Sequence, residues 1–469
     1  MESDYSRAAR EYRLARYYLG KLRTVDEAMR RGQAHISYGR TVFDHEWEQI
    51  RHWQAWATQC EPSDSERARL CKDFALAGLE VLANRINAVE HAAWLHAALV
   101  AAEQLGDEDA ERTLCYELMM MYYRLGALDK GKHFASEMLR LGEAANDMLS
   151  IERAYFGLAV YSEERGMYVE AEHDYQQALR LSKELGIAAE TGRALNALGG
   201  VAEYVGDFQK SFQYFSQYLD LMETHGQQSR VCHALISVGE SLIFLKAYTE
   251  AEQRLQRAVL MCRALGLQRL LGVGLLTLGS LAIEEEQLDA AETYLQEGLV
   301  AVRAVGVQRQ IIDGLTRLGY ICLRRGDATS ALNYLREALT IARDVGNPRY
   351  LWDVQLHLAN THLALNDVSA ARSALHASLR IAQRLGSHPR KVRNLSGVIA
   401  YCECLGQHER AALWAGAIIG DSVIDEPVFA PICARLEAAL KHDRYLRALA
   451  EGGRRPLDDV LAEALAYLA

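Results

Sequence analysis

The feature that most constrains this chain is a turn residue that returns at a fixed interval. Gly166 is followed by Gly206, and 206 − 166 = 40. The same step continues in both directions through Gly126, Lys246, Glu286, Gly326, Asn366 and Gly406. A second series in the same frame is Gly106, Gly186, Gly226, Gly266, Gly306, Gly346 and Gly386. A fixed period of roughly 20 to 50 residues is the signature of a solenoid.

Bulk composition agrees with a well-packed array. Half of the 469 residues are hydrophobic and six are proline, so there is ample material for a core. Because each solenoid unit packs on its neighbours, length counts units and does not imply several domains. Lys and Arg number 52 against 62 Asp and Glu, a net charge of −10. This balance disfavours direct binding to nucleic acid, which rests on clustered basic residues.

The sequence shows no sign of a membrane span or of secretion. It has no run of about eighteen apolar residues, the length that a membrane helix needs. The first residues, MESDYSRAAREYRLARYYL, are charged and lack the apolar centre of a secretory signal. Most of the nine cysteines fall in helical patterns, which suits reduced thiols that pack as small hydrophobes. We therefore expect a cytoplasmic protein that does not bind membranes.

Each repeat is expected to hold two helices separated by the two turns. Glycine suits the turns because it enters the left-handed backbone conformation at a helix end without steric cost. Aspartates that follow the turn are predicted N-caps of second helices, namely Asp207, Asp327 and Asp367. First helices carry a Leu-Gly-like pair at Leu198-Gly199, Val238-Gly239, Leu278-Gly279 and Leu318-Gly319. Small residues there let two helices approach closely.

The segment before the regular array is predicted to be helical as well. Residues 1–30 form one amphipathic pattern, and residues 44–57, DHEWEQIRHWQAWA, form a second, with Asp44 as its expected cap. The tryptophans of this second helix are interpreted as a packing hub, because large aromatic side chains dominate burial energetics. We divide the chain into N-terminal helices with degenerate repeats (1–106), a regular array (107–405) and C-terminal capping helices (406–469).

The repeated positions resemble the tetratricopeptide repeat (TPR), lengthened from about 34 residues to 40. The resemblance rests on the Leu-Gly pairs and on the small residues of the second helices, such as Ala171, Ala251 and Ala331. The signature tryptophan is replaced by Leu195, Leu275 and Leu315. The proline that ends the repeat is mostly absent, and Pro348 is the exception. The expected fold class is therefore all-α: a right-handed α-solenoid of 40-residue TPR-like helix pairs with helical caps.

Two flanking motifs resemble STAND-type (NB-ARC/AfsR/MalT-like) signal-transduction NTPases. FDHEWEQIRHWQAWA (43–57) is similar to the helix that follows their nucleotide-binding and winged-helix region, although Gln49 replaces an asparagine. AALWAGAIIG (411–420) and the closing EGGRRPLDDVLAEALAYL look like their C-terminal end. The resemblance implies a TPR sensor that holds an ATPase switch inactive until an inducer binds, with the ATPase part missing from this chain.

A nucleotide or metal cofactor is not expected. GALDKGK (126–132) satisfies the phosphate-loop spacing, but His133 replaces the magnesium-binding Ser or Thr, and no strand precedes it. Cys402, Cys404 and His408 lack a second ligand pair, so core thiols are favoured over zinc. No catalytic triad or dyad can be proposed from the scattered histidines, and the acidic run 284–286 is interpreted as a solvated helix end. We expect no enzyme, no cofactor and no metal site.

The concave face of the array is the remaining candidate for function. In tetratricopeptide arrays this face is built by first-helix positions. Carried onto this frame, the candidate ligand- or partner-binding residues are Tyr116, Tyr123, Arg153, Arg193, Asn196, Glu203, Tyr204, His233, Glu240, Phe244, Tyr320, Arg324 and Asn360. Aromatic side chains provide contact area, while Asn and Arg orient backbone or carboxylate groups. The alternative for any single residue is a solvated or inter-repeat contact.

The favoured function is recognition without catalysis. We expect a sensor region of a STAND-type protein, with a protein, peptide or small-molecule inducer in the groove and an upstream nucleotide-binding switch as a partner. Such a protein would act in signal transduction and transcription regulation. The alternative is a free-standing TPR adaptor that scaffolds other proteins.

Overall fold

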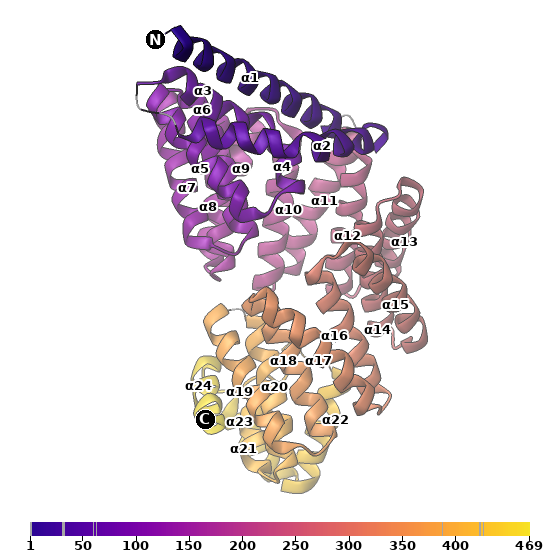
Figure 1. The fold of residues 1–469 in the computed structure, drawn as a ribbon. Coiled ribbons are helices and arrows are strands. Elements are labelled where there is room, and N and C mark those ends of the chain that lie inside the picture. The colour runs from indigo at the N-terminus through magenta and orange to yellow at the C-terminus, as the bar shows by residue number, and fades with distance from the viewer. Residues whose placement is uncertain are drawn as a thin grey trace. The chain divides into compact units, whose positions relative to one another are not determined.

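The computed structural model describes residues 2–30, 33–59, 61, 63–386, 388–421, 424 and 426–469. Every regular element in these ranges is an α-helix, and the helices follow one another as antiparallel pairs (Figure 1). The all-α repeat fold predicted from the 40-residue period is therefore confirmed. In the described ranges no helix is both long and apolar enough to span a membrane.

Five helices precede the regular array. They are α1 (Glu2–Arg30), α2 (Gln33–Thr58), α3 (Ser65–Ala77), α4 (Leu79–Arg85) and α5 (Ala88–Leu105). The predicted cap at Asp44 is wrong, because α2 begins at Gln33 and Asp44 lies inside the helix. Its carboxylate forms an ion pair with Arg85, while the neighbouring Phe43 extends the buried stripe of the helix.

The tryptophans of α2 form the predicted packing hub. Trp47 stacks on Phe43 at 5.0 Å and on Trp94 of α5 at 5.7 Å between ring centroids. Trp53 is buried and meets Trp56 edge to face. Aromatic pairs in these geometries contribute about 0.5–1.5 kcal/mol beyond their area burial.

The regular array repeats every 40 residues, and first and second helices alternate. The first helices are α6 (Glu108–Arg124), α8 (Met148–Glu164), α10 (Ala188–Val205), α12 (Gln228–Phe244), α14 (Gln268–Glu284), α16 (Gln308–Arg324), α18 (Pro348–Ala364) and α20 (His388–Cys404). The second helices are α7 (Leu128–Ala145), α9 (Tyr168–Glu184), α11 (Phe208–Thr224), α13 (Tyr248–Leu265), α15 (Leu288–Val305), α17 (Ala328–Val345), α19 (Val368–Leu385) and α21 (His408–Gly416).

The turn positions keep the left-handed conformation even where the residue is not glycine. Lys246, Glu286 and Asn366 have φ angles of 59°, 59° and 58°. Asn146, which fills the gap in the second glycine series, has φ 55°. A non-glycine residue at positive φ carries a conformational cost. The repeat geometry therefore fixes the backbone at these positions, and the residue type adapts to it.

Helix caps follow the sequence pattern within the array. The side chains of Asp207, Asp327 and Asp367 accept hydrogen bonds from the backbone N–H groups of Lys210, Ser330 and Ala370, at 3.0, 3.0 and 3.1 Å. The three predicted caps are therefore confirmed. Each satisfies one of the N–H groups that a helix start leaves without an intrahelical partner.

Glycines in the first helices mark close helix contacts. A Cβ atom added at Gly199, Gly239, Gly279 or Gly319 would lie 2.4, 2.6, 2.6 or 2.8 Å from the side chain of Phe215, Leu255, Leu295 or Leu335. Those side chains belong to the second helix of the same unit and are buried. The Leu-Gly pair is thus explained by packing within each helix pair.

The C-terminal helices are α22 (Glu426–Leu440), α23 (His442–Gly452) and α24 (Leu457–Leu468). Pro456 occupies the N-cap position of the last helix, and Asp458 and Asp459 lie in its first turn. Trp414 of α21 is fully buried and meets Tyr467 of α24 edge to face at 5.8 Å. The array therefore ends on an aromatic contact between a repeat helix and the final helix.

The chain divides into two compact units. One holds Met1–Glu164 and His173–Gly186, and the other holds Arg165–Glu172 and Ile187–Ala469. Each unit is described by itself below, and the boundaries predicted at 106/107 and 405/406 stay predictions.

Candidate inner groove of the second unit

First helices of the second unit that are far apart in sequence approach one another, and we call the region between them the inner groove. The turn before α9 reaches α19, where a Cβ on Gly166 would lie 2.8 Å from the carbonyl oxygen of Leu385. The turn after α10 reaches the start of α20, where a Cβ on Gly206 would lie 3.5 Å from Pro389. Helices far apart in sequence thus meet and close one turn of the superhelix within this unit.

A cluster of aromatic rings and guanidinium groups forms this closure. Tyr204 of α10 stacks on Tyr168 with 5.8 Å between centroids. The guanidinium carbons of Arg349 and Arg390 lie 4.5 and 5.4 Å from the Tyr204 ring centroid. Arg390 also lies 5.4 Å from the ring of Trp352 and donates a hydrogen bond to the Tyr168 hydroxyl at 3.2 Å. We call these five residues the closure cluster.

Two buried donors of the closure cluster have no acceptor among the described residues. They are Nε of Arg390 and Nε1 of Trp352, on side chains that are 9% and 6% exposed. Burial of a charged donor without an acceptor is costly. The surrounding rings offset part of that cost, because a guanidinium over an aromatic face is attracted by the ring quadrupole.

Two carboxylates line the groove beside the closure cluster. Glu203 and Glu240, on α10 and α12, are partly exposed. Desolvation raises the pKa of Glu203 well above its usual range, and repulsion from Glu240 adds to it. Desolvation also raises the pKa of Glu240, while Arg317 and Arg309 oppose the shift. A carboxyl that is surrounded by protein yet lacks a direct cationic partner behaves in this way.

Cations from α16 interact with these carboxylates. Arg309 is exposed at the start of α16. Interaction with the Tyr204 phenol raises the pKa of its guanidinium, and Tyr350 and Glu240 add to the increase, whereas desolvation opposes it. His233 of α12 is half-buried, and desolvation followed by the nearby Arg269 and Arg309 lowers its pKa to about 4. The imidazole is therefore neutral at physiological pH.

The other predicted residues of the second unit are held by local partners. Arg193 pairs with Glu190 at 3.0 Å, and Asn196 Oδ1 accepts a hydrogen bond from Ser237 at 3.5 Å. Phe244 stacks on Phe208 at 4.6 Å. Arg324 donates to the hydroxyl of Tyr320 at 2.9 Å.

Asn360 is the last of the predicted binding residues in the second unit. Its Oδ1 would lie 3.7 Å from a Cβ added at Gly397 of the next first helix. Asn360 and Tyr320 occupy the position in α18 and α16 that Glu240 occupies in α12, since 320 − 240 = 80 and 360 − 320 = 40. Gly200 stands at the same position in α10, and nothing lies within 4 Å of a Cβ added there. This row of equivalent positions follows the groove.

Three predicted residues belong to the first unit instead. The guanidinium of Arg153 lies 4.6 Å from the ring centroid of Tyr116. Tyr123 donates a hydrogen bond to the carbonyl of Gly157 at 2.8 Å, and burial raises its pKa. Its ring also covers Gly131, so the phosphate-loop-like string 126–132 is occupied by helix packing.

The sequence analysis selected Arg193 and Arg324 but missed Arg269, Arg309, Arg349 and Arg390. A signal for three of them exists, because Arg269, Arg309 and Arg349 each stand second in a first helix and recur at the 40-residue step. Arg390 is third in α20, where Pro389 takes the equivalent position. A repeat alignment that followed polar residues as well as glycines would have identified this series of arginines.

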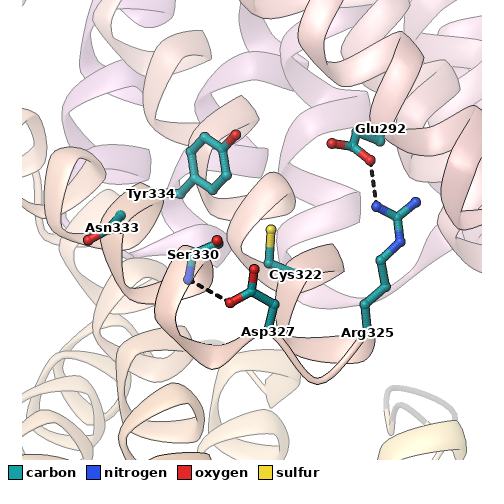
Figure 2. A pocket seen from close by; sticks show the side chains of 7 residues that line it. All are labelled: Glu292, Cys322, Arg325, Asp327, Ser330, Asn333 and Tyr334. Atoms are coloured by element: carbon teal, nitrogen blue, oxygen red, sulfur yellow. Dashed lines mark hydrogen bonds and ion pairs between the residues drawn. The ribbon is translucent and has the colours of Figure 1, made fainter.

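A separate shallow pocket of about 440 Å³ lies at the turn between α16 and α17 (Figure 2). Its polar groups are used locally: Arg325 pairs with Glu292, and Asp327 caps α17 through the N–H of Ser330 at 3.0 Å. Figure 2 shows these contacts around Cys322 and Tyr334. Because caps and ion pairs account for the pocket, we place the candidate site in the groove instead.

The cysteine motif is likewise structural. Cys402 is buried in α20, where desolvation raises the pKa of its thiol to about 12, and Cys404 is exposed. No group of three potential metal ligands occurs within the described ranges. Burial therefore keeps the Cys402 thiol protonated at neutral pH.

Comparison with protein families agrees with the helix pairs. The family model described as the MalT-like TPR region matches residues 187–344. A second model, of anaphase-promoting complex subunit 5, matches residues 318–389. The TPR resemblance read from the Leu-Gly pairs is confirmed. No curated protein has a sequence that matches the chain significantly.

Several solved structures are similar to this chain at low sequence identity. A Rap protein complexed with competence and sporulation factor is 15% identical over 83% of this chain and 99% of that chain, with a TM-score of 0.54. The Rap conjugation gene regulator of plasmid pLS20, in complex with the Phr* peptide, is 12% identical over 92% and 98%, with a TM-score of 0.46. The STAND protein PH0952 from Pyrococcus horikoshii, which has a tetratricopeptide repeat sensor, is 15% identical over 87% and 57%, with a TM-score of 0.46.

Proposed function

We propose that the second unit is a recognition domain whose inner groove binds a peptide or an extended protein segment. The observation that carries the proposal is that Glu203, Glu240 and Arg309 have no hydrogen-bond or ion-pair partner among the described residues, although opposite charges face one another there. Solenoids present such inner surfaces for binding. The role assigned to the chain is non-enzymatic, in the cytoplasm.

The proposed context is the sensor region of a STAND-type signalling protein that regulates transcription. The match of residues 187–344 to a MalT-like TPR region supports it, as do the two flanking motifs. The Rap protein of the same fold was solved with competence and sporulation factor, so a partner can be held by such a fold. The upstream nucleotide-binding switch would lie outside this chain.

The proposed mechanism couples the groove to the closure cluster. Tyr204 belongs to that cluster, and Glu203 precedes it on the same helix turn. A ligand between the first helices changes the contacts that close the superhelical turn. It shifts curvature only by the difference in its affinity for the two shapes.

Binding to the groove can be tested with immobilised protein and a pool of randomised short peptides, with retained peptides identified by mass spectrometry. The wild type should retain a defined subset, and the double variant Asn196→Ala/Tyr204→Ala should lose it. Leu260→Ala, on the outer helix α13 where Leu260 is 65% exposed, is the matched control and should retain it. Unchanged retention by the double variant would show that the ligand binds elsewhere.

The signalling context needs a different measurement. An antibody against this chain should detect a native gene product well above 52.5 kDa, the mass of this sequence. The portion upstream should then bind ATP. A product of 52.5 kDa would instead favour the free-standing adaptor.

A further inference from the structure

Arg390 of the closure cluster differs from another arginine that is buried to the same extent. Arg390 and Arg112, the latter on α6 of the first unit, are both 9% exposed. Arg112 pairs with Asp147 at 3.1 Å and with Asp109. No described carboxylate lies within ion-pair distance of Arg390, which donates instead to a neutral group, the hydroxyl of Tyr168, at 3.2 Å. Arg390 therefore carries a buried charge without a counter-ion among the described residues.

A second donor without an acceptor lies beside this charge. Nε1 of Trp352 and Nε of Arg390 are both buried and have no hydrogen-bond partner among the described residues. The guanidinium carbon of Arg390 lies 5.4 Å from the ring centroid of Trp352, although the two residues belong to different first helices, α20 and α18. Two donors on adjacent groups suit the two oxygens of a carboxylate.

The indole of Trp414 shows why the buried guanidinium is the deciding feature. Its Nε1 atom is also buried without an acceptor. The cation near it, Arg410, is exposed, and its guanidinium carbon lies 5.9 Å from the Trp414 ring centroid. An exposed cation keeps its hydration, whereas a buried one has lost it and needs a partner. An unpartnered indole is therefore not enough to indicate a site, and its combination with Arg390 is.

Tyr204 controls access to the two donors. The other four members of the closure cluster are at most 9% exposed, whereas Tyr204 is partly exposed. Its ring centroid lies 5.4 Å from the guanidinium carbon of Arg390. A ligand in the groove can therefore reach Arg390 when the Tyr204 ring moves.

We propose that the closure cluster is a carboxylate-binding site, in which Arg390 and Trp352 hold a carboxylate of the bound peptide. This inference rests on the proposed function and names the ligand group that the cluster recognises. Nε of Arg390 donates to one carboxylate oxygen and Nε1 of Trp352 donates to the other. The carboxylate supplies the counter-ion that Arg390 lacks, so a buried charge pair replaces a buried single charge. Because the ligand enters past Tyr204, it acts on the contacts that close the superhelical turn.

Three matched pools of randomised short peptides, all acetylated at the N-terminus, test the inference. The first pool has a free C-terminal carboxylate and no acidic residue. The second has a C-terminal amide and one glutamate, and the third has a C-terminal amide and no acidic residue. Immobilised wild-type protein should retain the first or the second pool at least about tenfold more than the third, because hydrogen bonds to a charged group are strong. The first pool compared with the second distinguishes a C-terminal carboxylate from a side-chain carboxylate.

Variants assign the preference to the two donors. Arg390→Gln should remove the preference for a carboxylate. Trp352→Phe keeps an aromatic ring and removes only the indole N–H, and it should reduce the preference by about threefold or more. Arg303→Gln, in the outer ion pair with Glu337, is the control and should leave the preference unchanged.

The indole N–H of Trp352 reports the contact in the wild-type protein by nuclear magnetic resonance. With isotope-labelled tryptophan, a retained carboxylate peptide should shift the Trp352 signal downfield, because the N–H gains an acceptor. The matched amide peptide should not shift it. The Trp352→Phe variant assigns the signal, and the signal of Trp414 is the internal control, which neither peptide should shift.

The outcomes separate this inference from the proposed function. Equal retention of all three pools by the wild type would overturn the inference and leave peptide binding in place. Retention of none would overturn both. A Trp352 signal that the carboxylate peptide leaves unchanged would overturn the assignment. So would an Arg390→Gln variant that folds, as judged by its circular dichroism, and still prefers a carboxylate.

Discussion

Tyr204 and Arg349 are in contact although three first helices, α12, α14 and α16, separate α10 from α18 in the sequence. The guanidinium carbon of Arg349 lies 4.5 Å from the centroid of the Tyr204 ring. A contact of this kind closes one superhelical turn. It also gives the groove a defined starting shape, against which the effect of a ligand can be measured.

The Tyr204–Arg349 contact should be measurable as a coupling energy. Tyr204→Ala and Arg349→Met each remove one partner, and the double-mutant cycle isolates the interaction between them. For a desolvated cation–π pair we expect coupling of about 0.5–2 kcal/mol, measured by urea unfolding. Tyr204→Phe keeps the ring face and should show most of the wild-type stability. Additive effects of the two substitutions would mean that the contact contributes nothing.

Adjacent glycines in α10 should respond in opposite directions to alanine. Gly199→Ala places a Cβ 2.4 Å from the ring of Phe215, and overpacking of this kind destabilises by about 1–3 kcal/mol. Gly200→Ala meets no atom within 4 Å, and alanine is the better helix former by up to about 1 kcal/mol. Thermal unfolding of the two variants tests this. Equal shifts would contradict the packing explanation of the Leu-Gly pair.

His233 should make the protein less stable as the solution becomes acidic. Its pKa is lowered from 6.5 to about 4 in the folded state, so the unfolded chain binds the proton first as pH falls. The contribution is fully present above pH 6.5 and is lost between 6.5 and 4. As the pH falls through that window, the stability of His233→Asn relative to the wild type should therefore rise. Urea unfolding at several pH values measures this. His442→Asn, at an exposed side chain, is the control and should not follow this trend.

Glu203 should make the protein less stable as the solution becomes more alkaline. Its folded pKa is raised well above 4.5, so the folded protein holds a proton that the unfolded chain has released. The contribution of Glu203 to the free energy of unfolding is lost as the pH rises from 4.5 to the folded pKa. It stays lost at higher pH. Glu203→Gln should gain relative stability over that range, whereas Glu250→Gln on the outer helix α13 should not. A pH-independent difference for Glu203→Gln would contradict the enclosed position of this carboxyl.

The repeat could be predicted from sequence because its signals are local. The backbone at Lys246 and Glu286 follows the period although neither residue favours positive φ. The cap predicted at Asp44 failed for a reason that is also local: a capping residue was inferred without regard to the helical residues before it, and Arg85 supplies the actual partner. Local patterns therefore fix the turns more firmly than the starts of irregular helices.

The groove could be predicted only in part. First-helix positions selected Glu203, Tyr204, His233 and Glu240, which the structure places in one region of the second unit. Arg349 and Arg390 were missed because their approach to Tyr204 depends on the rotation that accumulates over several units. That rotation is a sum of small packing angles between helices, which no single repeat encodes.

The most direct test of peptide recognition is a photo-crosslink from inside the groove. A benzophenone amino acid at position 200, where the groove is open, should capture a discrete peptide or protein segment in the native cells. The same amino acid at position 300 on α15, where Val300 is 70% exposed, is the outer-surface control. The account predicts a product from position 200 that is absent from position 300 and that disappears in the Glu203→Gln/Glu240→Gln background. Identical products from both positions, or none from position 200, would contradict it.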